Sequence, residues 1–450
     1  DCVTVGSGIE LAEALAKRLG KKYTHLAVYR NFGTAQVKHT EKNFETGEIT
    51  EMEIEFVGAR RESYSHDSRK PIVEDGTLVD DQNRRDLTIN DLAICLNKER
   101  FGELIDPFHG VEDLEAGLIR TPLDPDITFS DDPLRMLRAI RFACRFDFKI
   151  VPETFEAIAR NKDRIKIISS ERIIDELNKI MLCQQPSKGW ILLQRCGLLQ
   201  IIFPELQALS GIESREGRGH KDNFVHTLTV LDNVCKAQES AKSDDLSLKN
   251  NFDKRLYLRW AAIFHDLGKA KVKLYDEKLG WTFHNHDYVG MRMVLPIMRR
   301  LKLPLGAEKN YVEKMVGMHM RPIHLADEGI TDSAIRRVMF EAGEDTDDLM
   351  TLCEADITSK IPEKVKRFLD NFKIVRQKMV EIQEKDDYRN WTPPIDGNEI
   401  MERYHLTPSR EVGILREAQK DAILDGLCEN TREAALAFLD EKAKEIGILK

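Results

Sequence analysis

The sequence predicts an α+β protein, with a small domain of strands and helices followed by domains made of helices alone. Residues 1–125 mix short strand patterns with an amphipathic helix, and from Ser130 onward the apolar spacing is helical. Polar or turn-forming stretches at about 238–253 and 393–397 interrupt the helical part. A chain of 450 residues has room for two to four domains. We therefore expect four parts, at 1–125, 126–215, 216–390 and 391–450.

In the first part, apolar alternation and turn-forming residues place the elements. The expected order is a strand at 2–5, a helix at 9–19, a hairpin of 25–29 with 33–39, a strand at 52–57 and a polar mobile loop at 62–81. The helical part is expected to contain helices at 131–146, 155–160, 171–182 and 187–196, a histidine-rich block from about 220 to 385, and a helical tail at 399–448.

The composition is typical of a globular protein. Hydrophobic residues make up 42% and charged residues 32%, and no apolar run approaches the roughly 18 to 20 residues of a membrane span. The eight cysteines are scattered without a CxxC pair, which predicts reduced thiols and a cytoplasmic location. The net charge of −9 disfavours nucleic-acid binding only weakly, because a local basic face suffices for it.

The segment Arg84-Arg85-Asp86-Leu87-Thr88-Ile89-Asn90 concentrates groups that suit a nucleotide. Guanidinium groups pair with phosphate oxygens through two parallel hydrogen bonds. On a helix, Asp86 and Asn90 would share a face and could bind ribose hydroxyls. The alternative is a charged turn that leads into a helix.

The segment Asp131-Asp132-Pro133-Leu134-Arg135 could read a base. With Ser130 as N-cap and Pro133 in the first turn, Asp132 and Arg135 would project from one helix face. A carboxylate acceptor beside a guanidinium donor matches the amino group and ring nitrogen of cytosine and adenine, and it rejects uracil and guanine. The alternative is an ordinary intrahelical salt bridge. Arg138, Arg141 and Arg145 follow at helical spacing, as a basic stripe that could track RNA or simply face solvent.

The chain resembles class II tRNA nucleotidyltransferases and their poly(A) polymerase relatives. The resemblance covers nearly the whole chain and is carried by FGTAQVK, EIEFVGARRESY, RRDLTIN, IDPFHG, DDPLRMLRAIRF and ERIIDELNKIML. It implies a small polymerase-β-like nucleotidyltransferase sheet domain, followed by helical neck, body and tail domains. The implied activity is addition of CCA to tRNA 3′ ends from ATP and CTP, with no membrane partner.

The resemblance also implies roles for single residues. Asp1 matches the second carboxylate of a DxD pair that binds Mg²⁺, and Glu55 would face the same ions if its strand pairs beside Asp1; an edge-strand charge is the alternative for Glu55. Arg85, Asp86 and Asn90 match the ribose and triphosphate motif, and Asp132 and Arg135 match the base-reading pair; Arg138 and Arg141 of the basic stripe are further nucleotide-binding candidates. The family's Gly-Gly motif and first DxD aspartate would precede position 1, so we expect a chain that starts at Asp1 to hold half a metal site and to lack polymerase activity.

Seven of the twelve histidines fall between positions 220 and 324. His265-Asp266-Leu267-Gly268-Lys269 follows an apolar helix at 256–264 and resembles the HD phosphohydrolase superfamily. The implied ligands of a divalent metal of unknown identity are His226, His265, Asp266, His286, His319 and Asp356. His220 and His284 are weaker candidates, and Lys269 could contact a phosphate. The implied activity is a phosphatase or 2′,3′-cyclic phosphodiesterase.

Three functions remain open. The leading one is a CCA-adding enzyme with an HD domain, which the loop at 62–71 with Arg69 favours. The second is a poly(A) polymerase, or an enzyme that adds only C or only A. The third is an HD phosphohydrolase or RNA-binding module alone.

Overall fold

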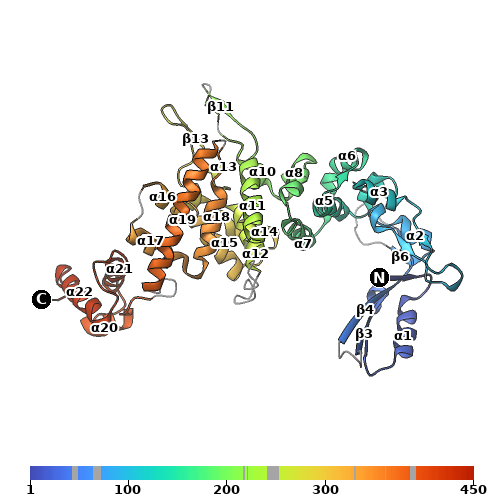
Figure 1. The fold of residues 1–450 in the computed structure, drawn as a ribbon, viewed down its shortest axis with the longest axis horizontal. Helices are drawn as coiled ribbons and strands as arrows, with labels where there is room; N and C mark the ends of the chain where they lie inside the picture. The colour runs from blue at the N-terminus through green and yellow to red at the C-terminus, as the bar shows by residue number, and fades with distance from the viewer. Residues whose placement is uncertain are drawn as a thin grey trace. The chain divides into compact units, whose positions relative to one another are not determined.

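The computed structural model describes residues 1–42, 49–63, 72–215, 218–219, 221–240, 253–328, 331–359, 361–385 and 392–449. The chain forms two compact units, Asp1–Phe203 and Pro204–Lys450 (Figure 1). None of the described helices has the length and apolar character that a membrane span needs. All eight cysteines lie in the described part of the chain, and they remain thiols.

The first unit begins with a four-stranded sheet in the order β1-β4-β3-β2. These strands are β1 (Cys2–Thr4), β2 (Thr24–Tyr29), β3 (Thr34–Lys42) and β4 (Ile49–Gly58). Strand β1 runs parallel to β4, and the other neighbours are antiparallel. Helix α1 (Gly8–Leu19) packs on β3 and β4, and Ala12, Ala35, Val37 and Phe56 form the core between them (Figure 1). The predicted strands, hairpin and helix are confirmed.

Helix α1 can start where it does because of a glycine. A Cβ atom on Gly8 would lie 2.7 Å from the Val57 carbonyl carbon, so no larger residue fits there. The Ser7 side chain accepts a hydrogen bond from the Glu10 backbone N–H and caps the helix. This close contact holds the start of α1 against β4. Strand β1, which follows Asp1 directly, pairs with the same strand.

The predicted loop at 62–81 is wrong at both of its ends. Strand β5 (Arg60–Ser63) pairs with β6 (Ile72–Asp75), and α2 (Leu78–Asn83) follows with a capping box between Thr77 and Asp80. Strands of four residues are too short to show a clear alternation, which is why the pattern resembled a loop. Positions 64–71, including Arg69, lie outside the described residues.

Short elements and helices complete the first unit. In order they are 3₁₀ helix η2 (Thr88–Asn90), β7 (Ala93–Ile94), β8 (Leu104–Ile105), α3 (Gly110–Ala116), β9 (Leu118–Ile119), α4 (Pro125–Asp131), α5 (Leu134–Phe146), β10 (Lys149–Ile150), α6 (Pro152–Asn161), α7 (Ser170–Met181), α8 (Ser187–Arg195) and α9 (Leu198–Ile202). Helices α6, α7 and α8 confirm three predicted helices.

The predicted helix at 131–146 is wrong at its start. Asp124 caps α4, Pro125 occupies its first turn, and this helix ends at Asp131, so Ser130 lies inside a helix and caps none. Asp132 is extended, with φ −132° and ψ 100°, and α5 begins at Leu134. A residue that precedes proline is pushed out of the helical region, and Pro133 therefore separates the two helices.

The second unit is mainly helical. Its elements are α10 (Pro204–Gln207), β11 (Ser214–Arg215), β12 (Arg218–Gly219), α11 (Asn223–Ser240), α12 (Lys254–Phe264), α13 (Lys269–Val272), β13 (Leu274–Asp276), β14 (Gly280–Thr282), α14 (His286–Leu301), α15 (Ala307–Met318), α16 (Arg321–Glu328), α17 (Asp332–Ala342), α18 (Thr346–Asp356), α19 (Pro362–Lys385), α20 (Gly397–Tyr404), α21 (Arg410–Leu424) and α22 (Arg432–Glu445).

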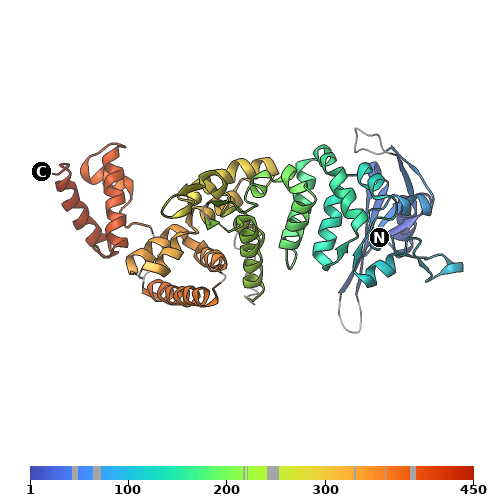
Figure 2. The same ribbon diagram turned by 90° about the horizontal axis from the view of Figure 1, so that it is seen from above.

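Helix α12 is the centre of this unit. It packs against α11, α15 and α18, and its residues from Leu256 to Phe264 are all buried. Two small antiparallel hairpins were not predicted: β11–β12 lies just before the histidine-rich block, and β13–β14 lies within it. The last three helices pack around Ile400, Leu415 and Leu439, which confirms the predicted helical tail (Figure 2).

Candidate functional sites

Asp1 and Glu55 lie together at one end of the sheet. Because Cys2 is in parallel register with Phe56, the residues that precede them are at the same level on adjacent strands. Both line a cavity of about 250 Å³, together with Gln36 from β3. The Gln36 amide donates to Glu53 and, at 3.5 Å, to Glu55. Two carboxylates in one open cavity suit Mg²⁺, which prefers oxygen ligands.

Asp86 and Asn90 are in contact, although no α-helix carries them. Asn90 lies in η2, and its amide donates to the Asp86 carboxylate over 3.1 Å. The other Asp86 oxygen accepts from Arg138 on α5 over 2.5 Å. Asp86 and Asn90 therefore do contact each other, but the prediction that they share a face of one helix is wrong. Three of the predicted nucleotide ligands form one polar network.

Arg85 is held in place from two sides. Its guanidinium donates to the buried Asp81 carboxylate over 3.1 Å and to the Asn90 backbone carbonyl over 3.0 Å. Arg84 also pairs with Asp81. Asp81 was missed as a functional residue, although its spacing of three and four residues before the two arginines on a helix end could have revealed it.

Asp132 and Arg135 do not meet as the sequence predicts. Arg135 is buried, and its guanidinium donates to the backbone carbonyls of Arg84 and, over 3.4 Å, Thr128. One Asp132 oxygen accepts from the Leu134 backbone N–H over 3.1 Å, and the other from Arg172 over 3.2 Å. The break between α4 and α5 explains this, since the two residues no longer share a helix face.

Arg141 lies in the core of the first unit. Its guanidinium donates to the buried Glu176 carboxylate on α7 over 2.5 Å, and it stacks 4.0 Å from the Phe142 ring. Arg138 is half-buried and Arg145 is exposed. The predicted basic stripe is therefore not a continuous solvent-facing surface, because its members have different partners.

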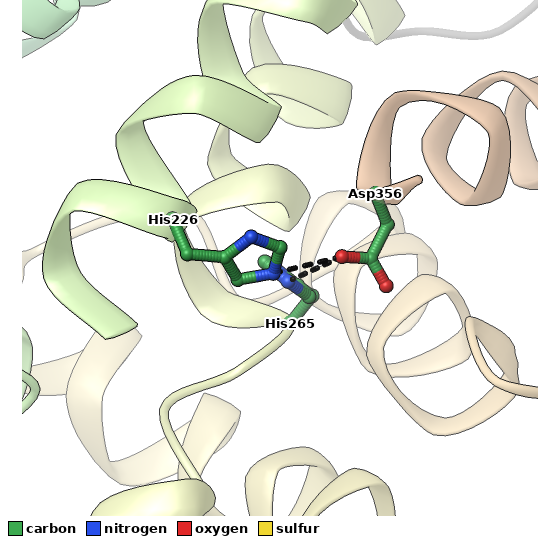
Figure 3. Close-up of side chains that lie close together, drawn as sticks. All are labelled: His226, His265 and Asp356. Atoms are coloured by element: carbon green, nitrogen blue, oxygen red, sulfur yellow. Dashed lines mark ion pairs between the residues drawn. The ribbon is translucent and has the colours of Figure 1, made fainter. Parts of the chain in front are cut away.

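In the second unit, six predicted metal ligands come from three helices, α11, α14 and α18, and from the turns that follow α12 and α15. Their ligand atoms form two groups, each within 4.8 Å: His226 with His265 and Asp356, and Asp266 with His286 and His319. The Nε2 atoms of His226 and His265 lie 2.9 and 3.6 Å from the same Asp356 oxygen (Figure 3). Asp266 links the two groups, because its carboxylate oxygens lie 3.3 Å from Nε2 of His265 and 3.4 Å from Nε2 of His286.

The four histidine rings are oriented by their Nδ1 atoms. These atoms lie 2.7 to 2.8 Å from the backbone carbonyls of Ala262, Phe283 and Val316 and from the Thr358 hydroxyl. A carbonyl can only accept, so Nδ1 donates in His265, His286 and His319, and Nε2 is the nitrogen directed toward the cluster. This arrangement is typical of histidines that bind metal.

Two buried atoms in the cluster make no hydrogen bond: Nε2 of His265 and Oδ1 of Asp266. A buried polar atom without a hydrogen bond is costly, unless an ion satisfies it. Imidazole nitrogens together with carboxylates suit a divalent transition metal. The six residues therefore fit a divalent metal site.

The charges within the cluster are uneven. Burial opposes a charge on His265, but the Asp266 and Asp356 carboxylates outweigh it and raise the pKa of His265 to about 10. Burial lowers the pKa of His319 to about 4. Despite burial, the hydrogen bond from His226 and the positive charge of His265 hold the pKa of Asp356 well below its usual range. Without metal, a proton on His265 offsets part of the negative charge of the two carboxylates.

Metal binding should therefore depend on pH. His265 must lose its proton to coordinate, so we expect the affinity of EDTA-treated protein for a divalent ion such as Mn²⁺ to rise about tenfold per pH unit between pH 6 and 8 for each proton released. Isothermal titration at several pH values measures this. The exposed His324 is outside the cluster, and the His324→Ala variant should keep the same slope. A pH-independent affinity would contradict the arrangement.

The three weaker candidates, Lys269, His284 and His220, differ in where they lie relative to the cluster. Lys269 donates to the Asp266 carboxylate over 2.6 Å, so it belongs to the cluster. His284 is exposed beside it, and His220 lies outside the described residues. Thr358, which holds His226, was missed because a threonine two residues after Asp356 carries no sequence signal.

Three family models match the chain. They are described as the poly A polymerase head domain at 1–120, the probable RNA and SrmB-binding site of polymerase A at 147–209, and the HD domain at 223–361.

Similar proteins agree with these matches. The A-adding tRNA nucleotidyltransferase of Deinococcus radiodurans is 30% identical over 375 residues, which cover 82% of this chain and 80% of that protein. The multifunctional CCA protein of Psychromonas ingrahamii is 33% identical over 58% of this chain and 59% of its own length. A solved structure of a CCA-adding enzyme in its apo form II has a TM-score of 0.61 at 22% identity, and the match covers 97% of this chain and 85% of that one.

Proposed function

This chain belongs to the class II tRNA nucleotidyltransferase and poly(A) polymerase family, with an HD domain, and from this premise we propose that it adds CCA to tRNA 3′ ends from CTP and ATP. The observation that carries the proposal is the shared cavity of Asp1 and Glu55. These residues would hold Mg²⁺, which would supply charge stabilisation at the α-phosphate. Arg85, Asp86, Asn90 and Arg138 would bind the ribose and phosphates.

We propose that each of the four predicted parts of the chain forms one domain. Residues 1–125 form the nucleotidyltransferase head, 126–215 the neck, 216–390 the HD domain and 391–450 the tail. The absence of disulfides among the eight cysteines supports a cytoplasmic location.

Single-nucleotide incubations test the main activity. Transfer RNA that lacks CCA should gain two nucleotides with CTP alone and three with CTP and ATP together, and then stop. Continued addition of A would instead identify a poly(A) polymerase. Growth only of tRNA that already ends in CC would identify an A-adding enzyme, like the Deinococcus relative.

Base selection should depend on Asp132. We expect Asp132→Ala to lower the preference for CTP over UTP by about 5- to 150-fold, since a paired base contact contributes roughly 1–3 kcal/mol of discrimination. Misincorporation of UTP and GTP into tRNA measures the effect. Asp131→Ala, at the end of α4, is the matched control. Unchanged nucleotide preference in Asp132→Ala would remove this residue from base reading.

For the second unit we propose hydrolysis of 2′,3′-cyclic phosphates or terminal phosphates on RNA. The oriented histidines and the two carboxylates support a divalent metal, which would supply an activated water. That water would add to phosphorus, one P–O bond to ribose would break, and the released oxygen would take a proton. An HD phosphohydrolase without polymerase activity is the alternative, and the incubations above decide between them.

A further inference from the structure

Two lysines lie at the metal-ligand cluster of the second unit. Lys269, at the start of α13, donates to a carboxylate oxygen of Asp266 over 2.6 Å, and its side chain is 19% exposed. Lys221 lies two residues before α11, the helix that carries the ligand His226. A charged ammonium group has three donors and no lone pair, so it cannot coordinate a metal. The two lysines are therefore cations that a bound metal does not use.

Thr358 places Lys221 at the cluster. The Lys221 ammonium group donates to the Thr358 backbone carbonyl over 2.6 Å. The hydroxyl of the same threonine lies 2.8 Å from Nδ1 of His226, and Thr358 is two residues beyond the ligand Asp356. One residue therefore contacts both Lys221 and a candidate metal ligand.

The charges around Lys221 agree with this position. The side chain is exposed, yet partial desolvation of its ammonium group lowers the pKa of Lys221. The charges that act next on this group belong to four residues: Asp356, Lys269, Lys364 and Asp266. Two of these four are carboxylates of the cluster, and Lys269 is bonded to one of them. Lys221 therefore faces the cluster electrostatically as well as through Thr358.

A bound metal would leave the cluster with surplus positive charge. The carboxylates of Asp266 and Asp356 bring two negative charges, which one divalent ion would neutralise. Coordination would also leave His265 neutral. The ammonium groups of Lys221 and Lys269 would then remain, and a surplus of positive charge in a partly buried site attracts an anion.

The size of this surplus distinguishes two classes of phosphate. A terminal phosphomonoester has a second pKa of about 6 and is a dianion at pH 8. A 2′,3′-cyclic phosphate is a diester and carries one negative charge at most. Two ammonium groups therefore match the charge of the phosphomonoester and exceed that of the cyclic phosphate.

We propose that Lys221 and Lys269 form a phosphate clamp at the metal-ligand cluster, and that this clamp makes terminal phosphomonoesters the preferred substrate class of the second unit over 2′,3′-cyclic phosphates. The ammonium groups bind the phosphate oxygens through charge-assisted hydrogen bonds. The clamp rests on the proposed hydrolase function. The phosphomonoester can end an RNA chain or belong to a free nucleotide, because both present the same group.

Kinetics with two adenosine substrates test the clamp in the metal-loaded protein at pH 8. Wild-type protein should have a higher kcat/KM for adenosine 2′-monophosphate than for adenosine 2′,3′-cyclic phosphate. Lys221→Gln should raise KM about tenfold for the monophosphate and about threefold for the cyclic phosphate, because a charge interacts twice as strongly with a dianion as with a monoanion. The kcat should stay within about twofold of wild type.

Two further variants serve as controls. Lys221→Arg keeps the charge and should keep KM within about twofold of wild type. Lys236→Gln removes an exposed lysine that lies ten residues beyond His226 on α11, and it should match wild type. An unchanged KM in Lys221→Gln, an equal rise in Lys236→Gln, or a higher wild-type kcat/KM for the cyclic phosphate would overturn the proposal. A lower bound metal content in Lys221→Gln would overturn it as well, since Lys221 would then act through Thr358 and His226.

A third substrate distinguishes an RNA end from a free nucleotide. A higher kcat/KM for an oligonucleotide with a 2′-phosphate end than for adenosine 2′-monophosphate, with the same loss in Lys221→Gln, supports the clamp with RNA as the source. The reverse order with the same loss supports the clamp with a free nucleotide as the source.

Binding of inorganic phosphate separates the clamp from the hydrolase function. If wild-type protein hydrolyses neither adenosine substrate, the hydrolase function fails, and isothermal titration of the Mn²⁺-loaded protein with inorganic phosphate decides about the clamp. The Kd should be about tenfold higher in Lys221→Gln than in wild type and unchanged in Lys236→Gln. Identical Kd values in the two variants would overturn the clamp.

Discussion

Replacing His265 and Asp266 with alanine is expected to abolish hydrolysis of 2′,3′-cyclic phosphates, with a loss of at least about 10³-fold. Both residues belong to the metal-ligand cluster, and Asp266 contacts both ligand groups. A lost metal removes several kcal/mol of transition-state stabilisation, and each 1.36 kcal/mol is about tenfold in rate. Hydrolysis of adenosine 2′,3′-cyclic phosphate, together with the bound metal content, measures the effect.

The same preparation supplies an internal control, since CCA addition belongs to the other unit and should continue. Because both residues are buried, a thermal melt must show that the variant is folded. Asp356→Asn is a milder second variant, which keeps the shape of a ligand at the end of α18. Cyclic-phosphate hydrolysis that persists in folded, metal-depleted variants would refute the assignment.

The second large effect is expected at Glu55. Glu55→Gln should lower nucleotide addition to tRNA by about 10³-fold, because the substitution removes one charge from the cavity that Glu55 shares with Asp1. Asp1→Asn should act in the same direction. The rate of CMP addition at saturating CTP measures both, and added Mn²⁺ should recover part of the lost rate.

A matched control lies on the same strand. Glu53 is two residues from Glu55, on the same side of β4, and it pairs with Lys38 over 2.8 Å. Glu53→Gln should keep nucleotide addition within about threefold. If Glu53→Gln and Glu55→Gln are equally active, the carboxylate of Glu55 is an edge-strand charge, as the alternative interpretation holds.

Periodicity predicted the longer elements well. Helices α1, α6, α7, α8 and α12 lie within about three residues of their predicted bounds, because their apolar spacing is set by the face that each helix buries. The hairpins β5–β6 and β13–β14 were missed. Strands of three or four residues are too short to show a period, and only the pairing of the two strands defines them.

The sequence contains a signal for the helix break at Asp132, but the apolar spacing that follows outweighed it in the prediction. Asp124-Pro125 is a helix start, and Pro133 ends the helix before it. The apolar spacing after Leu134 nevertheless favoured one helix from 131. The assignment of Asp132 and Arg135 to one helix face depended on that helix, and in the structure Asp132 lies outside α5, which begins at Leu134.

The sequence by itself determined which chemical groups are present and which family they indicate. The spacing within RRDLTIN, DDPLR and HDLGK is local, and local spacing can be read along the chain. Only the tertiary structure decided which groups meet. His226 and Asp356 are 130 positions apart and lie 2.9 Å from each other, and Arg141 is paired inside the core rather than exposed. Burial and pairing depend on the packing of distant helices, so no local pattern specifies them.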